Sequence, residues 1–138
     1  MGNGVADAYA SSVYVSGTDV YVAGMEGNVA KLWKNGVATS LPNGTYALSV
    51  FVSGTDVYVA GNEITSASFA RMWKNGVVTS LSPNNSSAQS VFVFGTDVYI
   101  VGYIKPGIHD FATIWKNGVA TTLGTVTTTS FASCVFVK

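Results

Sequence analysis

The chain repeats one pattern three times, and this repetition limits its fold more than any other feature. A Gly-Thr-Asp-Val-Tyr phrase begins at Gly17, Gly54 and Gly95, and a Trp-Lys-Asn-Gly-Val phrase follows each time, at Trp33, Trp73 and Trp115. Self-similarity at about forty residues is typical of repeat architectures, in which each unit buries its apolar faces on its neighbours. The spacing therefore predicts three equivalent structural units.

Each unit is predicted to hold four short β-strands, because β-branched residues dominate and no helical period is present. The first strand recurs at residues 10–15, 50–52, 91–93 and 135–137, so it is written four times. The second lies at 20–23, 57–60 and 98–101, and each copy is expected to end at a glycine: Gly24, Gly61 or Gly102. The third lies at 29–34, 69–74 and 111–116, and the fourth at 37–41, 77–81 and 119–123.

An Asn-Gly pair joins the third strand to the fourth in every unit. This pair predicts a two-residue hairpin, because both central residues of such a turn need a positive φ. The first two strands are apolar at nearly every position, so both of their faces are expected to be covered. These features predict an all-β fold of β-propeller blades, made of three four-stranded antiparallel meanders plus one extra strand.

The predicted boundaries follow the repeats. Residues 1–8 are a loose N-terminal arm, and residues 9–44, 45–86 and 87–129 are the three blades. Residues 130–138 are a terminal strand that closes onto a neighbouring chain.

The Gly-Thr-Asp-Val-Tyr and Trp-Lys-Asn-Gly-Val phrases resemble the repeats of bacterial β-propeller proteins with an NHL- or kelch-like blade pattern. They also resemble the Trp-Lys-Asn-Gly repeats of other bacterial proteins. The resemblance covers residues 9–138 and implies a three-blade partial propeller. It implies little about activity, since propellers carry out many functions.

Three blades do not close a propeller, which typically has four to eight. We therefore expect the ring to be completed by homo-oligomerisation, with identical chains joined head to tail. A homodimer with six blades is preferred, and a homotrimer with nine blades is the next choice. The sequence leaves open whether the first or the last copy of the first strand takes the innermost position.

Composition excludes several functions. Seven basic residues balance seven acidic ones, which gives no electrostatic footprint for nucleic acid or an anionic membrane. The apolar runs are far shorter than the roughly twenty residues of a membrane span, and no signal peptide is predicted, so we expect a soluble protein of open location. The single Cys134 cannot form an internal disulfide. No metal or other cofactor is expected.

Few residues suggest a binding site. Trp33, Trp73 and Trp115 have the right chemistry to stack on sugar rings, but their recurrence on the third strand favours packing between blades. His109 lies in the longest loop beside Asp110, without a second histidine or a cysteine at metal-ligand spacing. Asp19, Asp56 and Asp97, like Lys34, Lys74 and Lys116, recur in register, and structural roles beside turns are favoured over ion binding.

Two functional hypotheses remain. The first is a structural, self-assembling propeller module without catalysis, either a natural fragment or an engineered partial propeller. The alternative is a lectin-like or small-ligand-binding propeller that uses its loop faces or central channel. An enzyme is not predicted, because no acid, base and nucleophile are singled out.

Overall fold

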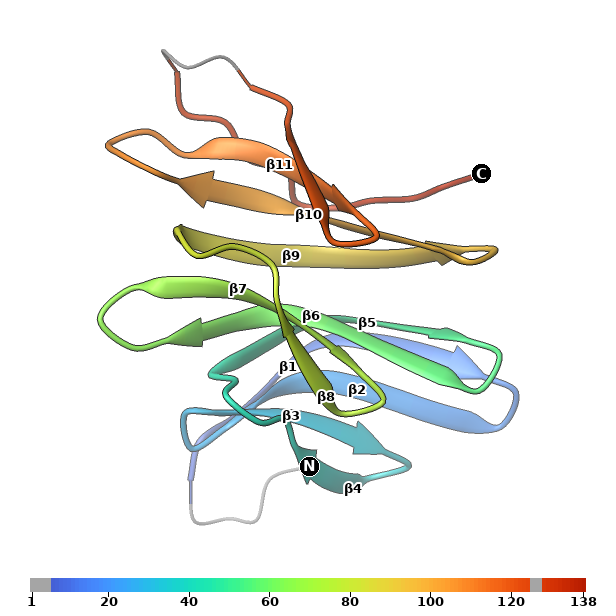
Figure 1. Ribbon diagram of the computed structural model, residues 1–138. Helices are drawn as coiled ribbons and strands as arrows, with labels where there is room; N and C mark the ends of the chain where they lie inside the picture. Colours follow the sequence, from blue (N-terminus) through green and yellow to red (C-terminus); the bar gives the residue numbers. More distant parts are fainter. Residues whose placement is uncertain (1–5, 125–127) are drawn as a thin grey trace.

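The computed structural model describes residues 6–124 and 128–138, and it is built from three four-stranded antiparallel sheets (Figure 1). Blade 1 contains β1 (Ala8–Ser16), β2 (Asp19–Glu26), β3 (Val29–Lys34) and β4 (Val37–Ser40). Blade 2 contains β5 (Tyr46–Ser53), β6 (Asp56–Ile64), β7 (Ser68–Lys74) and β8 (Val77–Ser80). Blade 3 contains β9 (Asn85–Phe94), β10 (Asp97–Lys105), β11 (Phe111–Lys116) and β12 (Val119–Thr122). Within each sheet the strands pair in chain order, which confirms the predicted meanders.

The predicted Asn-Gly hairpins are confirmed. Asn35 and Gly36 have φ values of 50° and 83°, and the two later pairs have nearly the same angles. The Asn35 side chain also ties this turn to β2, because its Oδ1 accepts the Val20 amide hydrogen at 2.9 Å. The same bond recurs from Val57 to Asn75 and from Val98 to Asn117, each at 2.8 Å. Asparagine thus supplies both the backbone angle and a cross-link.

The prediction that glycine ends the second strand is wrong, since Gly24, Gly61 and Gly102 lie inside β2, β6 and β10. Each faces a β-bulge in the first strand of its blade. The bulge brings a backbone carbonyl so close that a Cβ would lie only 1.9–2.0 Å from its oxygen. Glycine is therefore required at these positions because the backbone of the neighbouring strand comes so close, and not because the strand ends there.

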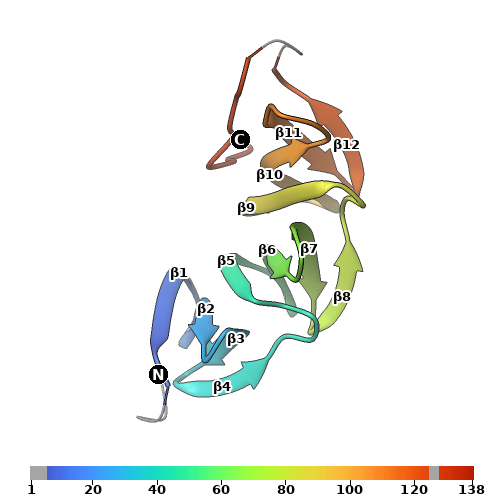
Figure 2. The same cartoon turned by 90° about the vertical axis from the view of Figure 1, so that its left-hand side faces the viewer.

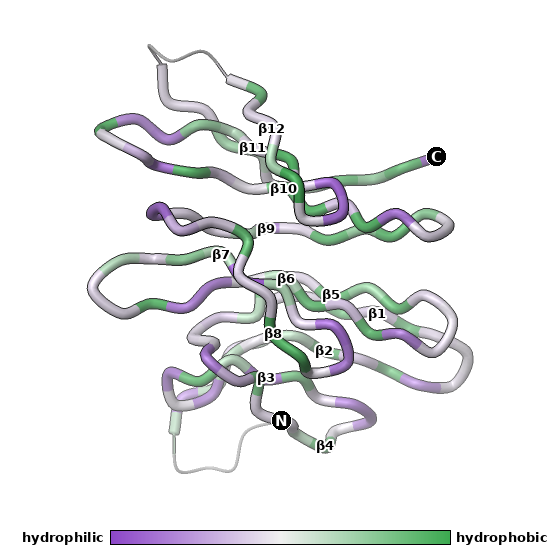
Figure 3. Tube along the Cα trace, viewed as in Figure 1, coloured by the Kyte–Doolittle hydropathy of each residue, from purple (hydrophilic) through white to green (hydrophobic). Residues whose placement is uncertain are grey.

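The blades are arranged as an open arc, with β1, β5 and β9 on its inner side and β4, β8 and β12 on its outer side (Figure 2). The arrangement is consistent with three propeller-like blades, and the described residues do not close a ring. Hydrophilic residues lie mainly at the turns, while most strand segments are apolar or neutral (Figure 3).

The hydrophobic core lies between blades. One cluster joins residues such as Tyr21 and Leu41 of blade 1 to Val50, Val52 and Trp73 of blade 2. The second cluster joins equivalent residues of blades 2 and 3. Blade 2 thus uses one face for blade 1 and the other for blade 3, as stacked repeats do.

The two predicted chain ends are described only in part. Residues 1–5 of the predicted arm lie outside the described residues, but Asp7 accepts a backbone hydrogen bond from Gly27 at 3.0 Å and β1 begins at Ala8. Residues 128–138 form no strand pair within the described part of the chain. In each blade the first strand pairs with a second strand. The sequence contains only three copies of the second strand, and each of them already pairs within its own blade.

Candidate functional site

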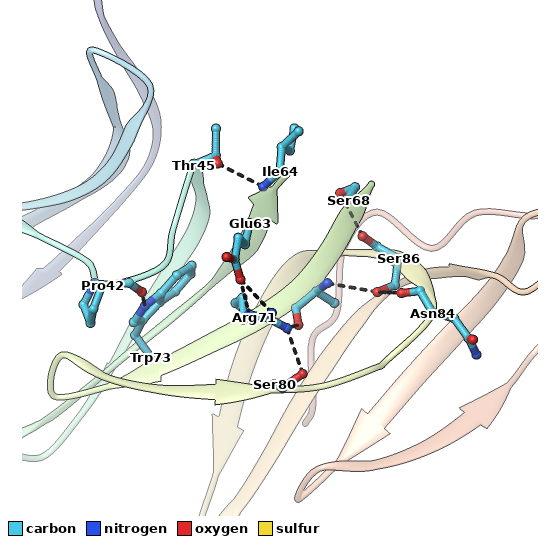
Figure 4. A network of polar contacts seen from close by, with 11 residues as sticks. Pro42, Thr45, Glu63, Ile64, Ser68, Arg71, Trp73, Ser80, Asn84 and Ser86 are labelled. Atoms are coloured by element: carbon cyan, nitrogen blue, oxygen red, sulfur yellow. Dashed lines mark hydrogen bonds and ion pairs between the residues drawn. The ribbon is translucent and has the colours of Figure 1, made fainter. Parts of the chain in front are cut away.

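The three tryptophans are buried, with exposed fractions of 2% for Trp33 and 0% for Trp73 and Trp115. The Trp73 indole N–H donates to the Pro42 carbonyl at 2.8 Å, and that of Trp115 donates to the Leu81 carbonyl at 3.1 Å (Figure 4 shows Trp73). Trp73 and Trp115 are members of the two inter-blade clusters. Their ring faces are therefore covered by protein and are not open to a sugar.

His109 does not join a cluster of reactive groups. In its loop, Lys105 pairs with Asp110 at 3.7 Å. Tyr103 lies at the edge of the Phe131 ring, and burial, helped by the Asp110 charge, raises the pKa of its hydroxyl. Within residues 6–124 and 128–138, no three His, Cys, Asp or Glu side chains come close enough to hold a metal ion.

The repeated aspartates and lysines form one polar cluster in each blade. In blade 1, Asp19 accepts a hydrogen bond from the Asn35 side chain at 2.8 Å and pairs with Lys34 at 3.1 Å. The Lys34 ammonium also lies 5.4 Å from the centre of the Tyr21 ring. Equivalent groups make the same contacts in blades 2 and 3.

These contacts perturb the titration of the exposed pairs. The Asn35 hydrogen bond and the Lys34 charge hold the pKa of Asp19 below its usual value, and Asn117 and Lys116 do the same for Asp97. Hydrogen bonding to Asp19 raises the pKa of Lys34, and Asp97 likewise raises that of Lys116. Since each carboxylate and ammonium has a local partner, the clusters link two hairpins of a blade, as structural contacts beside turns do.

A further polar network in blade 2 was not predicted. Arg71 pairs with Glu63 at 2.6 Å and donates to Ser80 at 2.8 Å, so it links the three strands β6, β7 and β8 (Figure 4). Nearby, the Ser86 hydroxyl accepts from the Ala70 amide at 2.9 Å and joins blade 2 to the start of blade 3. The only sequence signal was a Glu and an Arg on adjacent strands, which is too common to indicate a site.

The two ends of the arc expose residues that are buried elsewhere. In the first strands of blades 2 and 3, the equivalent valines are only 4–6% exposed: Val50, Val52, Val91 and Val93. Their counterparts in β1, Val13 and Val15, are 62% and 61% exposed. At the other end Leu123 is 58% exposed, whereas the equivalent Leu41 and Leu81 are 2% and 9% exposed.

These residues define two surfaces. We call Tyr9, Val13 and Val15 the blade 1 end face, and the half-buried Tyr99 with Leu123 the blade 3 end face. Shallow hollows follow the blade 1 end face, one of them lined by Ala10, Val13 and Val22. In the interior of the arc, the residues equivalent to these exposed valines and this leucine fill the interfaces between blades.

The C-terminal segment, defined as residues 130–138, lies on blade 3. The Ser130 amide donates to the Asp110 carbonyl at 2.7 Å, and the Val135 amide donates to the Ser90 hydroxyl at 3.3 Å. The second contact repeats the bonds from Val50 to Ser12 and from Val91 to Ser49, at 3.3 and 3.1 Å.

An aromatic row runs through the first strands and ends in this segment. The ring centres of Tyr14 and Phe51, of Phe51 and Phe92, and of Phe92 and Phe136 are 4.8, 4.7 and 5.0 Å apart. Phe136 therefore continues a ladder in which each ring belongs to a successive blade. The C-terminal segment occupies the position of the first strand of a fourth blade.

None of the described residues belongs to a helix with the length and apolar character needed to cross a membrane. Comparison of the sequence with protein-family models and with curated proteins found no match in either case.

Proposed function

We propose that this chain is a structural module that joins head to tail with copies of itself to complete a β-propeller ring. The observation that carries the proposal is the contrast in burial between equivalent residues. Val13, Val15 and Leu123 are about 60% exposed, while their counterparts inside the arc are nearly inaccessible to solvent. The proposal involves no catalytic step and no cofactor.

The interior interfaces indicate how two copies fit together. Trp73 belongs to the same core cluster as Leu41 of the preceding blade, and Trp115 to the same cluster as Leu81. By this equivalence, the Trp33 position of one copy faces Leu123 of the preceding copy. Trp33 is only 2% exposed within a single chain, so the residues that cover it there move aside when the copies join. Contacts at an end face then repeat contacts that the sequence already makes twice.

The apolar area at the end faces favours association. Complete burial of a Val or Leu side chain contributes about 1.5–3 kcal/mol, so three side chains that are roughly 60% exposed contribute several kcal/mol per interface. Part of this offsets the translational and rotational entropy lost on association. Ring closure adds one interface without a further loss of that entropy, which favours a closed ring over an open chain of copies.

Ring size follows from the blade count. Two copies give six blades, which lies within the usual range of four to eight, and three copies give nine. We therefore propose a homodimer first and a homotrimer second. The alternative of a lectin-like or small-ligand-binding propeller loses the support of exposed tryptophans, because all three are buried, and the loop faces and central channel would then be its binding surfaces.

The solution mass tests this proposal. Light scattering after size exclusion is expected to give about twice the 14.4 kDa of one chain, near 29 kDa, or about three times that mass, near 43 kDa. Leu123→Glu places a charge in the interface and is expected to yield folded single chains. Val119→Glu is the matched control, because Val37, Val77 and Val119 are all about 70% exposed and so belong to no interface in any blade. A folded wild-type chain of 14.4 kDa at high micromolar concentration contradicts the proposal.

A further inference from the structure

In a head-to-tail assembly two segments would occupy the same position beside β9: β1 of the incoming copy and the C-terminal segment. The incoming copy would place its β1 there, by analogy with β5 beside β1 and β9 beside β5. In each chain, however, the C-terminal segment already holds that position through Val135 and Phe136. Ring closure thus requires one of the two segments to leave.

We propose that the C-terminal segment keeps this position and replaces β1 of the next copy, pairing with that copy's β2. The partner is therefore a second copy of this chain, and the surface is the edge of β2 that β1 covers within a chain. This inference rests on the proposed self-assembly and goes beyond it by assigning the strand that crosses between copies.

The register of the exchanged pair follows from the repeats. In blade 1, Ser12, Val13 and Val15 lie opposite Ala23, Val22 and Val20 of β2. The equivalent residues of the C-terminal segment are Cys134, Val135 and Val137, which then lie opposite the same three partners in the second copy. One antiparallel ladder replaces another of the same length, so the exchange changes the number of backbone hydrogen bonds little.

The composition of the two segments decides which one is released. The segment that leaves is exposed to water, and exposure costs more for apolar side chains. At equivalent positions the two segments share two valines, and they differ mainly in that the C-terminal segment has Phe131 and Phe136 where β1 has Tyr9 and Tyr14. The two phenylalanines are already 61% and 72% exposed, so the composition favours release of β1 only through the greater hydrophobicity of Phe.

The burial of the two segments supports the same outcome. Val13 and Val15 of β1 are already largely exposed within the chain, so releasing β1 exposes little that was covered. After the exchange Val135 and Val137 of the neighbouring copy, and not Val13 and Val15, fill these two positions of the interface. Val135 and Val137, by contrast, are partly buried against blade 3. Phe136 would also bridge Phe92 of its own chain and Phe51 of the next, so the aromatic row continues across the junction.

Cys134 provides a direct test. In Ala23→Cys, the exchange places the introduced thiol directly opposite Cys134 of the neighbouring copy, within the Cα separation of 4.4–6.8 Å that disulfides need. Within one chain β2 and the C-terminus lie in different parts of the arc, at blade 1 and beside blade 3 (Figure 2), so a disulfide between residue 23 and Cys134 must be intermolecular. Oxidised glutathione supplies the oxidant, and each disulfide formed releases two reduced glutathione molecules. Ala60→Cys is the matched control, because Ala60 is the equivalent residue of blade 2 and lies opposite Ser49 of its own chain.

Two charge substitutions test the same point without cysteine chemistry. If the exchange occurs, Val135→Glu weakens association by about tenfold or more, because a charge enters the interface, while Val13→Glu on the released strand leaves it unchanged. Folding of each variant is checked by circular dichroism.

We expect Ala23→Cys to give covalent oligomers on a non-reducing gel and Ala60→Cys to give none. Of the two charge substitutions, we expect only Val135→Glu to weaken association. If the wild type assembles but Ala23→Cys gives no cross-link, and Val13→Glu is the variant that dissociates the ring, then β1 keeps its place and the inference is wrong. A wild-type chain that stays single overturns the self-assembly proposal as well, and light scattering detects that outcome independently of the cysteines.

Discussion

Replacing Trp73 by alanine tests the packing between blades 1 and 2. The Trp73 side chain is completely buried, and it lies in the cluster that holds Leu41, Val50 and Val59. The linker packs tightly on the ring as well, since a Cβ at Gly44 would lie 2.6 Å from an indole carbon. The substitution therefore opens a cavity in an interface with little room to rearrange.

The expected loss can be worked out from these contacts. A buried Trp side chain covers about 150–250 Å², which at about 25 cal/mol per Å² corresponds to roughly 4–6 kcal/mol. Measured Trp-to-Ala changes in cores cost about 3–5 kcal/mol, and we adopt this range. The lost hydrogen bond adds little, because Pro42 is exposed and water can reach its carbonyl. The melting temperature should fall by roughly 10 °C or more.

Equilibrium urea unfolding followed by far-UV circular dichroism measures this loss, with all variants at one protein concentration. Lys74→Ala is the control, because Lys74 is adjacent in sequence, its side chain is 50% exposed, and its ion pair with Asp56 is worth about 0–1 kcal/mol. If Trp73→Ala lowers the free energy of unfolding by less than about 1 kcal/mol, the indole does not hold the blades together and its face is available to a ligand.

Three further predictions follow from other parts of the fold. Gly61→Ala should destabilise the chain by about 1–3 kcal/mol or more, since its Cβ would meet the Tyr46 carbonyl at 2.0 Å, while Gly107→Ala, with no atom nearby, should be neutral in the same urea assay. Folding lowers the pKa of Asp19 and Asp97, so their contribution to stability should be complete above the ordinary pKa of 3.8 and decline as the pH falls below it. Melting temperatures measured over a pH series check this, and the same acid dependence in Asp97→Asn and the wild type would contradict it. Cys134→Ser should tighten self-association several-fold in a light-scattering dilution series. In the exchanged strand residue 134 takes the place of Ser12, whose hydroxyl accepts a hydrogen bond from the Val50 amide, and a hydroxyl accepts this bond better than a thiol does. Unchanged affinity would speak against the exchange.

The sequence determined the blade count, the strand order and the turns, because these depend on local chemistry. Asn35 and Gly36 favour positive φ wherever they stand between two apolar strands, so the hairpin could be predicted without knowing its neighbours. The repeated tryptophans and aspartates make the same kind of contact in more than one unit, as recurrence in the sequence suggests: Trp73 and Trp115 lie in the clusters between blades, and Asp19 and Asp97 each bond an asparagine side chain.

Only the tertiary structure decided features that depend on segments far apart in the chain. Gly24 was taken for the end of a strand, and its true reason is a carbonyl of β1 that a bulge brings against it. The same valine is buried in β5 and exposed in β1, because burial depends on whether a blade lies in front of it and not on the residue itself. The position of Phe136 on blade 3 is of the same kind: local sequence makes residues 135–137 suitable for a first strand, but only the packed array places them in the position that the next copy's β1 would need.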